Sequence, residues 1–166
     1  AQALLSSEKD RAENVMIADL LRNDLSRVCR PHRVDVRELC VLESFATVHH
    51  LTSTVIGQLD AGRDAVDLLR ATFPGGSITG APKIRAMEII NELEKSKRCA
   101  YSGAVGYFGF DGNHDSCIAL RTAVVKDGKA YVQAGAGVVA DSDPDYEFNE
   151  TVNKAMGLVK GIERAG

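Results

Sequence analysis

The first part of the chain changes from a helical to an extended pattern of apolar positions. After Ser6 and Ser7, apolar residues recur every three or four positions, which predicts a helix capped by these serines and running to about Val28. Pro31 closes that segment, because proline cannot continue a helix. Residues 34–59 are rich in β-branched side chains and alternate between polar and apolar, which predicts strand structure with two unlike faces.

The middle of the chain has helical patterns on both sides of a glycine-rich loop. Residues 64–73 predict a short helix, and apolar residues after Pro82 recur on one helical face. The loop FPGGSITGAPK places Gly75 and Gly80 at the spacing of a nucleotide-binding P-loop, but Lys83 does not follow Gly80 directly. The segment is therefore not a P-loop. It is either an ordinary loop-to-helix junction or an anion site at a helix N-terminus.

The last part of the chain predicts hairpins followed by a helix. Turns that contain Asp111-Gly112 and Asp127-Gly128 are strong hairpin signals, so we expect an antiparallel meander. The strand-like runs cover residues 100–110, 115–125 and 129–140, and the final helical pattern covers residues 143–164.

The order of helix, strands, helices, hairpins and helix indicates the fold class. It favours an α+β fold, in which an antiparallel sheet has flanking helices, over a parallel doubly wound sheet. A chain of 166 residues has the size of one domain, so we expect residues 1–166 to form a single domain. The chain begins without Met and close to a helix, from which we expect a fragment of a longer protein.

Composition argues against several classes of protein. Hydrophobic residues make up 45% of the chain and charged residues 26%, as in globular proteins. The net charge of -3 argues against a nucleic-acid-binding protein, which normally carries a basic surplus. No apolar run approaches the roughly 20 residues of a membrane span, and no secretory leader is recognisable. The four cysteines form no CxxC pair, so we expect buried thiols in a cytoplasmic protein.

Acidic residues lie on one face of each of two predicted helices. Asp10 and Glu13 are three positions apart in the first helix, and Glu147 and Glu150 are three apart in the last, with Lys154 one turn further on. Such residues are mostly solvated helix surface. Mg²⁺, however, is held by one or two carboxylates together with water and substrate oxygens. The two sets therefore also allow a magnesium site, beside which the lysine could neutralise a second anionic group.

Other residues are candidates for ligand binding. Gly135 and Gly137 lie at the end of a predicted strand, where glycines indicate either a bulge or the close approach of a ligand. Arg121 lies inside an apolar strand, where it either pairs with an anion or faces water at an edge. His50 and Tyr101 can each contact a ligand or simply pack. The residues alone thus predict a magnesium-assisted site for a small dianion.

Six stretches together resemble the chorismate-utilising enzyme family, in the order in which that family has them. The resemblance covers nearly the whole chain and is to the C-terminal part of the subunits that aminate chorismate. The segments VHHLTSTV and PGGSITGAPK are more similar to the aminodeoxychorismate (para-aminobenzoate) branch, whereas SGAVGYFGFDG and YVQAGAGVVADS also occur in the anthranilate branch. The stretches are DRAENVMIADLLRNDLSRV, TVHHLTSTV, PGGSITGAPKIRAMEIINELE, SGAVGYFGFDG, CIALRTAV and QAGAGVVADSDPDYEFNETVNKA.

The resemblance implies a magnesium ion and a set of chorismate contacts. Glu13 and Glu150 would bind Mg²⁺, with Asp10 and Glu147 supporting it through water. The remaining candidates would surround chorismate: Arg121 and Tyr101 at the enolpyruvyl carboxylate, the backbone of Gly135, Ala136 and Gly137 with Lys154 at a second anion pocket, Ser77 in a pocket loop, and His50 as an acid/base or orienting group beside the ring.

The resemblance also implies a reaction and a partner. We expect component I of aminodeoxychorismate synthase, which aminates chorismate to 4-amino-4-deoxychorismate by way of a lysine in a PIKGT motif that this chain does not contain. The alternatives are anthranilate synthase, which adds ammonia directly and expels pyruvate, isochorismate or salicylate synthesis with water, and an inactive fragment that only binds. Family members take ammonia from a glutamine amidotransferase, so we expect that partner, and we expect the isolated fragment to be inactive.

Overall fold

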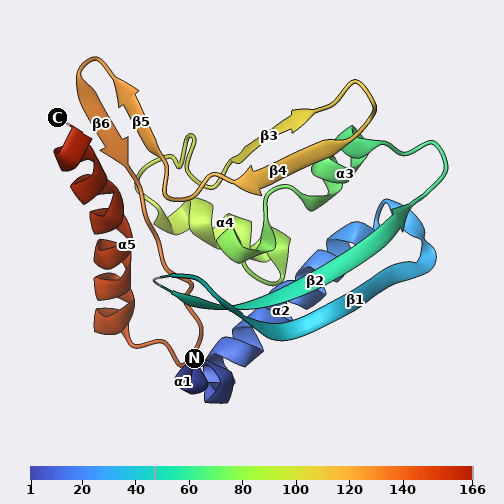
Figure 1. Cartoon of the computed structure of the whole chain (residues 1–166), viewed down its shortest axis with the longest axis horizontal. Helices are drawn as coiled ribbons and strands as arrows, with labels where there is room; N and C mark the ends of the chain where they lie inside the picture. The colour runs from blue at the N-terminus through green and yellow to red at the C-terminus, as the bar shows by residue number, and fades with distance from the viewer. Residues whose placement is uncertain (47, 166) are drawn as a thin grey trace. The chain divides into compact units, whose positions relative to one another are not determined.

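The computed structural model describes residues 1–46 and 48–165 and divides into two compact units (Figure 1). Unit 1 comprises residues 1–92 and 108–114, and unit 2 comprises residues 93–107 and the described residues from Asp115 on. Both contain helices and antiparallel strands, which confirms the α+β prediction. Within the described ranges, no helix is both long and apolar enough to span a membrane.

Unit 1 begins with the capped helix that the sequence predicts. A short helix, α1 (Gln2–Ser6), precedes α2 (Glu8–Ser26). Ser7 is the N-cap of α2, and its Oγ accepts a hydrogen bond of 3.2 Å from the backbone N–H of Asp10. The sequence did not predict that α1 is a separate helix. Ser7 adopts an extended conformation, which ends α1 and starts α2.

The extended segment of unit 1 is an antiparallel hairpin of β1 (Cys29–Ser44) and β2 (His49–Leu59). It starts at Cys29, before the predicted residue 34. Helix α2 ends at Ser26, so the helix does stop before Pro31 as predicted, and Pro31 itself lies in β1. The register shifts between Cys29, opposite Leu59, and Val34, opposite Gly57. This bulge accommodates Pro31, which has no N–H to donate to a partner strand. Thr47, which belongs to the predicted strand, lies outside the described residues.

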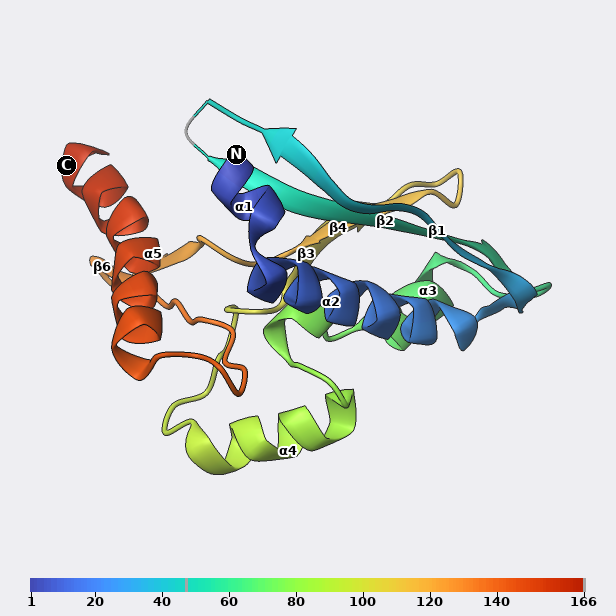
Figure 2. The same cartoon turned by 90° about the horizontal axis from the view of Figure 1, so that it is seen from below.

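Helix α2 packs along one face of the β1–β2 hairpin (Figure 2). The centre of the buried cluster is Val28, Cys29 and Ala71, where the end of α2, the start of β1 and helix α3 (Ala65–Thr72) meet. Asp64 caps α3 in a complete capping box with Asp67. Burial of these apolar groups fixes α2 and α3 relative to the hairpin.

A loop with a short 3₁₀ turn, η1 (Gly76–Ile78), joins α3 to α4 (Lys83–Leu93). As predicted, α4 begins directly after Pro82, whose carbonyl accepts a 3.0 Å hydrogen bond from the N–H of Ala86. The apolar residues of α4 are largely exposed: Ile84 retains 77% of its accessible surface and Leu93 retains 73%.

Two separate hairpins and one long helix make up unit 2, except that residues 108–114, at the turn of the first hairpin, are grouped with unit 1. The second strand-like run is not one strand, because the chain bends at Arg121, which has a φ of 52°. The predicted Asp127-Gly128 turn is confirmed by positive φ angles of 53° and 70°. The hairpins are β3 (Ala104–Phe108) with β4 (His114–Ile118) and β5 (Ala123–Lys126) with β6 (Lys129–Val132), and the helix is α5 (Pro144–Ala165).

Candidate functional site

Four of the residues singled out in the sequence lie together in unit 2. Lys154 Nζ lies 2.8 Å from Glu150 Oε2, one turn earlier on α5. The same ammonium donates to the carbonyl oxygen of Gly135 at 3.5 Å. The Tyr101 hydroxyl lies beside Gly135, where a larger residue would carry its side chain: a Cβ at residue 135 would lie 2.8 Å from Tyr101 Oη. Residues from the start of the hairpin region, the segment after β6 and α5 therefore converge on one place.

This group can bind an anion. The Lys154 side chain is 23% exposed, so its ammonium is partly shielded but accessible. An ammonium has three N–H donors, and two are directed at Glu150 and Gly135, which leaves one for a ligand. The Tyr101 hydroxyl supplies a second donor. Glu150 balances the lysine charge, so the group can hold its shape without a ligand.

The glycine segment after β6 is irregular and is tied to the start of α5. Residues 133–139 have no regular secondary structure. Val139 donates its backbone N–H to Ser142 Oγ at 3.1 Å, and Ser142 donates its hydroxyl to Glu147 Oε1 at 2.9 Å. Glu147 is 8% exposed. Its carboxylate thus fixes the end of the glycine segment to the first turn of α5.

The remaining candidates of unit 2 are less constrained. Ala136 is half-buried in the irregular segment, and a Cβ at Gly137 would meet nothing within 4 Å. Arg121 was predicted inside a strand, but the structure puts it in the bend between β4 and β5. It is exposed and makes no hydrogen bond or ion pair with the described residues. Its guanidinium is therefore available to an anionic ligand.

An ion pair that sequence analysis missed borders Tyr101. Arg98 Nη2 lies 2.6 Å from Glu94 Oε1, and the guanidinium carbon lies 5.8 Å from the centre of the Tyr101 ring. The hydrogen bond from Arg98 lowers the pKa of the Glu94 carboxyl. The spacing of Glu94 and Arg98, four residues apart, was a usable signal for this pair.

The candidates on α2 belong to unit 1. Glu13 is half-buried, with its Oε1 3.9 Å from Lys9 Nζ, and Asp10 lies one turn before it. The described residues contain no group of three or more His, Cys, Asp or Glu side chains that could hold a metal ion. Mg²⁺ does not require such a group, because it completes its shell with water and substrate oxygens.

The neighbouring residue, Asn14, joins α2 to both strands. Its Nδ2 donates to the carbonyl oxygen of Leu51 at 2.9 Å, and its Oδ1 accepts from the hydroxyl of Ser53. The Cys40 thiol lies 3.4 Å from the same Oδ1. This polar cluster fixes Glu13, the preceding residue, relative to β2.

His50 lies on the opposite face of β2 from Ser53. It is exposed, it is paired in register with Glu43, and its ring lies 5.4 Å from the ring of Phe45. Its ring is therefore accessible to a ligand on that face of the hairpin.

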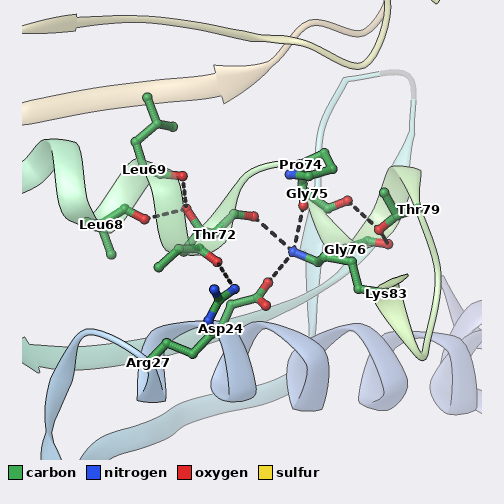
Figure 3. A network of polar contacts seen from close by, with 11 residues as sticks. Asp24, Arg27, Leu68, Leu69, Thr72, Pro74, Gly75, Gly76, Thr79 and Lys83 are labelled. Carbon is green, nitrogen blue, oxygen red and sulfur yellow. Dashed lines mark hydrogen bonds and ion pairs between the residues drawn. The ribbon is translucent and has the colours of Figure 1, made fainter. Parts of the chain in front are cut away.

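Ser77 lies exposed in the η1 turn, and the loop around it is fastened by a buried ion pair (Figure 3). Lys83 Nζ contacts Asp24 Oδ2, and the two side chains are only 13% and 4% exposed. Sequence analysis missed this pair. The signal was present in α2, because Asp24 follows Leu20 by four residues and so continues the buried stripe of that helix.

The sequence profile described as chorismate binding enzyme matches residues 1–160 of the chain. Anthranilate synthase component 1 of Aquifex aeolicus is 54% identical over 98% of the chain and 33% of its own length. Its counterpart from Streptomyces coelicolor is 56% identical over 98% of the chain and 32% of its own length. The chain thus spans about a third of the length of these curated relatives.

Solved structures of the same kind match the fold. Anthranilate synthase component I from Streptococcus pneumoniae superposes with a TM-score of 0.89 and 48% identity, over 95% of this chain and 36% of that one. The menaquinone-specific isochorismate synthase of Escherichia coli gives a TM-score of 0.83 at 28% identity, over 95% of this chain and 36% of that one. With a profile that matches nearly the whole chain and relatives above half identity, the protein belongs to the chorismate-binding enzyme family.

Proposed function

We propose that the chain is the chorismate-binding part of an anthranilate synthase component I. The observation that carries the proposal is identity above one half, along 98% of the chain, with the anthranilate synthases of Aquifex aeolicus and Streptomyces coelicolor. This product was the alternative in the sequence analysis, where the aminodeoxychorismate branch was preferred. The reaction converts chorismate and ammonia to anthranilate, pyruvate and water.

The cluster of Tyr101, Gly135, Glu150 and Lys154 in unit 2 supports chorismate as the ligand. Chorismate carries two carboxylates, so its pocket needs donors that converge without a large excess of positive charge. Lys154 has one N–H free of Glu150 and Gly135, and the Tyr101 hydroxyl lies beside the same glycine. In this proposal, one carboxylate binds Lys154 and the N–H groups of the glycine segment, and the other binds Tyr101 and Arg121.

Magnesium is part of the proposal. Carboxylate oxygens are the hard donors that Mg²⁺ prefers. Glu150 contacts Lys154 through Oε2, which leaves Oε1 for a metal, and Glu147 is fixed by Ser142 on the same helix. On α2, Glu13 is half-buried with Asp10 one turn away. A bound Mg²⁺ would act as a Lewis acid that orients the ring carboxylate of chorismate. His50 would orient the ring or exchange a proton with it.

Ammonia would come from a glutamine amidotransferase. Amination needs free ammonia at the reacting ring, and the residues of the candidate site include no nucleophile that would release it from glutamine. The relatives carry the designation component 1, which is consistent with a second subunit. We therefore propose that partner for the complete protein.

A second product has support of its own. The stretches VHHLTSTV and PGGSITGAPK resemble the aminodeoxychorismate branch. Both branches begin from chorismate and ammonia, so the same site serves either. The product of the reaction separates the two functions.

The test uses the complete translated product of the source gene, called the complete gene product below. It is incubated with chorismate, Mg²⁺ and an ammonium salt at alkaline pH, and products are separated by liquid chromatography. We expect anthranilate and pyruvate in equal amounts. 4-Amino-4-deoxychorismate without pyruvate would support the second product, isochorismate would point to the water-using branch, and unchanged chorismate would overturn the proposal.

A further inference from the structure

Lys83 is enclosed by acceptors at the start of α4. Its ammonium lies 2.5 Å from Asp24 Oδ2, 2.7 Å from the carbonyl oxygen of Pro74 and 3.1 Å from that of Thr72 (Figure 3). An ammonium has three N–H donors and no acceptor, so these contacts use all of them. Lys83 therefore has no donor left for a substrate anion, although it follows a glycine-rich loop.

Because the Lys83–Asp24 ion pair is buried, substitution of either residue should disturb it strongly. Both charged side chains are largely buried, and an ion pair is retained in such a place only when each charge is paired and hydrogen-bonded. Asp24 belongs to α2, whereas Thr72 ends α3 and Pro74 starts the loop. One nitrogen thus joins two helices, the first part of the loop and the first residue of α4.

The loop between these anchors is ordered by its own hydrogen bonds. Thr79 Oγ1 donates to the carbonyl oxygens of Gly75 and Gly76 at 3.0 and 3.2 Å (Figure 3). The N–H of Gly80 also donates to the carbonyl oxygen of Gly76, at 3.0 Å. Gly76 also lies against α2, since a Cβ there would be 2.8 Å from Leu20 Cδ2. The outcome is a compact turn that presents the exposed Ser77.

We propose that Lys83 and Asp24 are positioning residues that hold the Pro74–Gly80 loop in the shape that binds substrate. The inference rests on the proposed function, in which Ser77 lines the chorismate pocket. Neither residue touches the substrate. They act through the loop. Lys83 follows the end of the loop, and its ammonium binds both the carbonyl oxygen of Pro74, at the start of the loop, and the Asp24 carboxylate on α2.

The test compares Lys83→Met with Arg85→Met in the complete gene product. Arg85 is also a cation on α4, but its side chain is 58% exposed and pairs with Glu88 and Glu92 at the surface. We expect Lys83→Met to raise KM for chorismate about tenfold with little change in kcat, because a misplaced loop weakens substrate positioning. Arg85→Met should leave both constants at the parental values. A folded Lys83→Met protein with the parental KM would overturn the inference.

Lys83→Arg covers the case in which Lys83→Met does not fold. Arginine keeps the charge opposite Asp24, but its planar fork cannot direct donors at three acceptors that surround a single nitrogen. We expect a folded protein with KM raised several-fold. A parental KM for Lys83→Arg in a protein whose Lys83→Met variant does not fold would overturn the positioning role, because the pair would then serve stability alone.

Hydrogen exchange separates failure of this inference from failure of the proposed function. The N–H groups of Thr79 and Gly80 both donate to the carbonyl oxygen of Gly76. We expect them to exchange faster in Lys83→Arg than in Arg85→Met, whether or not the parent converts chorismate. Equal exchange would show that Lys83 does not order the loop. If exchange is faster in Lys83→Arg but the parent does not act on chorismate, the proposed function is refuted and the role of Lys83 in ordering the loop is retained.

Discussion

The hydroxyl of Tyr101 occupies the space in which residue 135 would carry a side chain. A Cβ at Gly135 would lie 2.8 Å from Tyr101 Oη, closer than such atoms approach in proteins. A larger residue at this position would therefore have to displace the Tyr101 hydroxyl. The relationship connects two residues that are 34 positions apart and were both singled out as ligand contacts.

Gly135→Ala should displace Tyr101 and weaken chorismate binding about tenfold, because a donor moved by about 1 Å loses its geometry. Gly137→Ala is the matched control, since its Cβ would meet nothing within 4 Å. Calorimetric titration of both variants of the complete gene product measures the effect. Equal dissociation constants for the two variants would contradict the role given to Gly135.

Lys154→Met should weaken chorismate binding about 10- to 100-fold, the range that corresponds to the loss of one hydrogen bond between charged groups. Lys160→Met, an exposed position on the same helix, should have no measurable effect. The same titration serves both variants. A strong effect at Lys160 would mean that general charge on α5, and not the geometry at Glu150 and Gly135, governs binding.

Asn14→Ala should destabilise the fold by about 1–3 kcal/mol, because it leaves buried partners on β1 and β2 without their hydrogen bonds. Asn23→Ala, an exposed position on the same helix, is the control. Urea unfolding monitored by circular dichroism gives the two midpoints. If the midpoints coincide, Asn14 does not fasten α2 to the hairpin.

The expectation of buried thiols is confirmed for Cys29 and Cys40 but is wrong for Cys99 and Cys117, which are exposed. Cys29 should therefore react with thiol reagents much more slowly than Cys99 and Cys117. Burial raises the pKa of the Cys29 thiol, so the fold favours its protonated form. The contribution of this thiol to the free energy of unfolding is fully present below the pKa of the unfolded thiol, about 8.5, and is lost as pH rises from that value through the higher pKa of the folded state. Mass spectrometry of timed alkylation at pH 8 and pH 9.5 checks the order of reactivity. Equal rates at the three cysteines would show that the core of unit 1 is open.

Local signals in the sequence were sufficient for several elements. Ser7 and Pro82 mark helix starts through backbone hydrogen-bonding rules, and Asp127-Gly128 marks a hairpin turn because both residues adopt positive φ. These predictions held because each depends on residues within one turn of the chain. The α+β class followed from the order of such elements.

Contacts between distant residues were not predictable in the same way. Lys83 and Asp24 are 59 positions apart, and only the packing of α2 beside the loop makes them partners. Arg121 was expected inside a strand, because its neighbours are apolar, but β4 ends at Ile118 and Arg121 lies with positive φ in the bend before β5. The spacing of apolar residues indicates the type of element and its buried face. It does not indicate where a strand ends when the residues beyond the end are equally apolar.

The most direct test of the account is a calorimetric titration of chorismate into the complete gene product, with and without Mg²⁺, beside a Glu150→Gln variant whose folding is checked by circular dichroism. We predict saturable binding that requires Mg²⁺ and is lost in Glu150→Gln. Absence of binding by the folded parent, or binding that neither Mg²⁺ nor Glu150→Gln changes, would contradict the account.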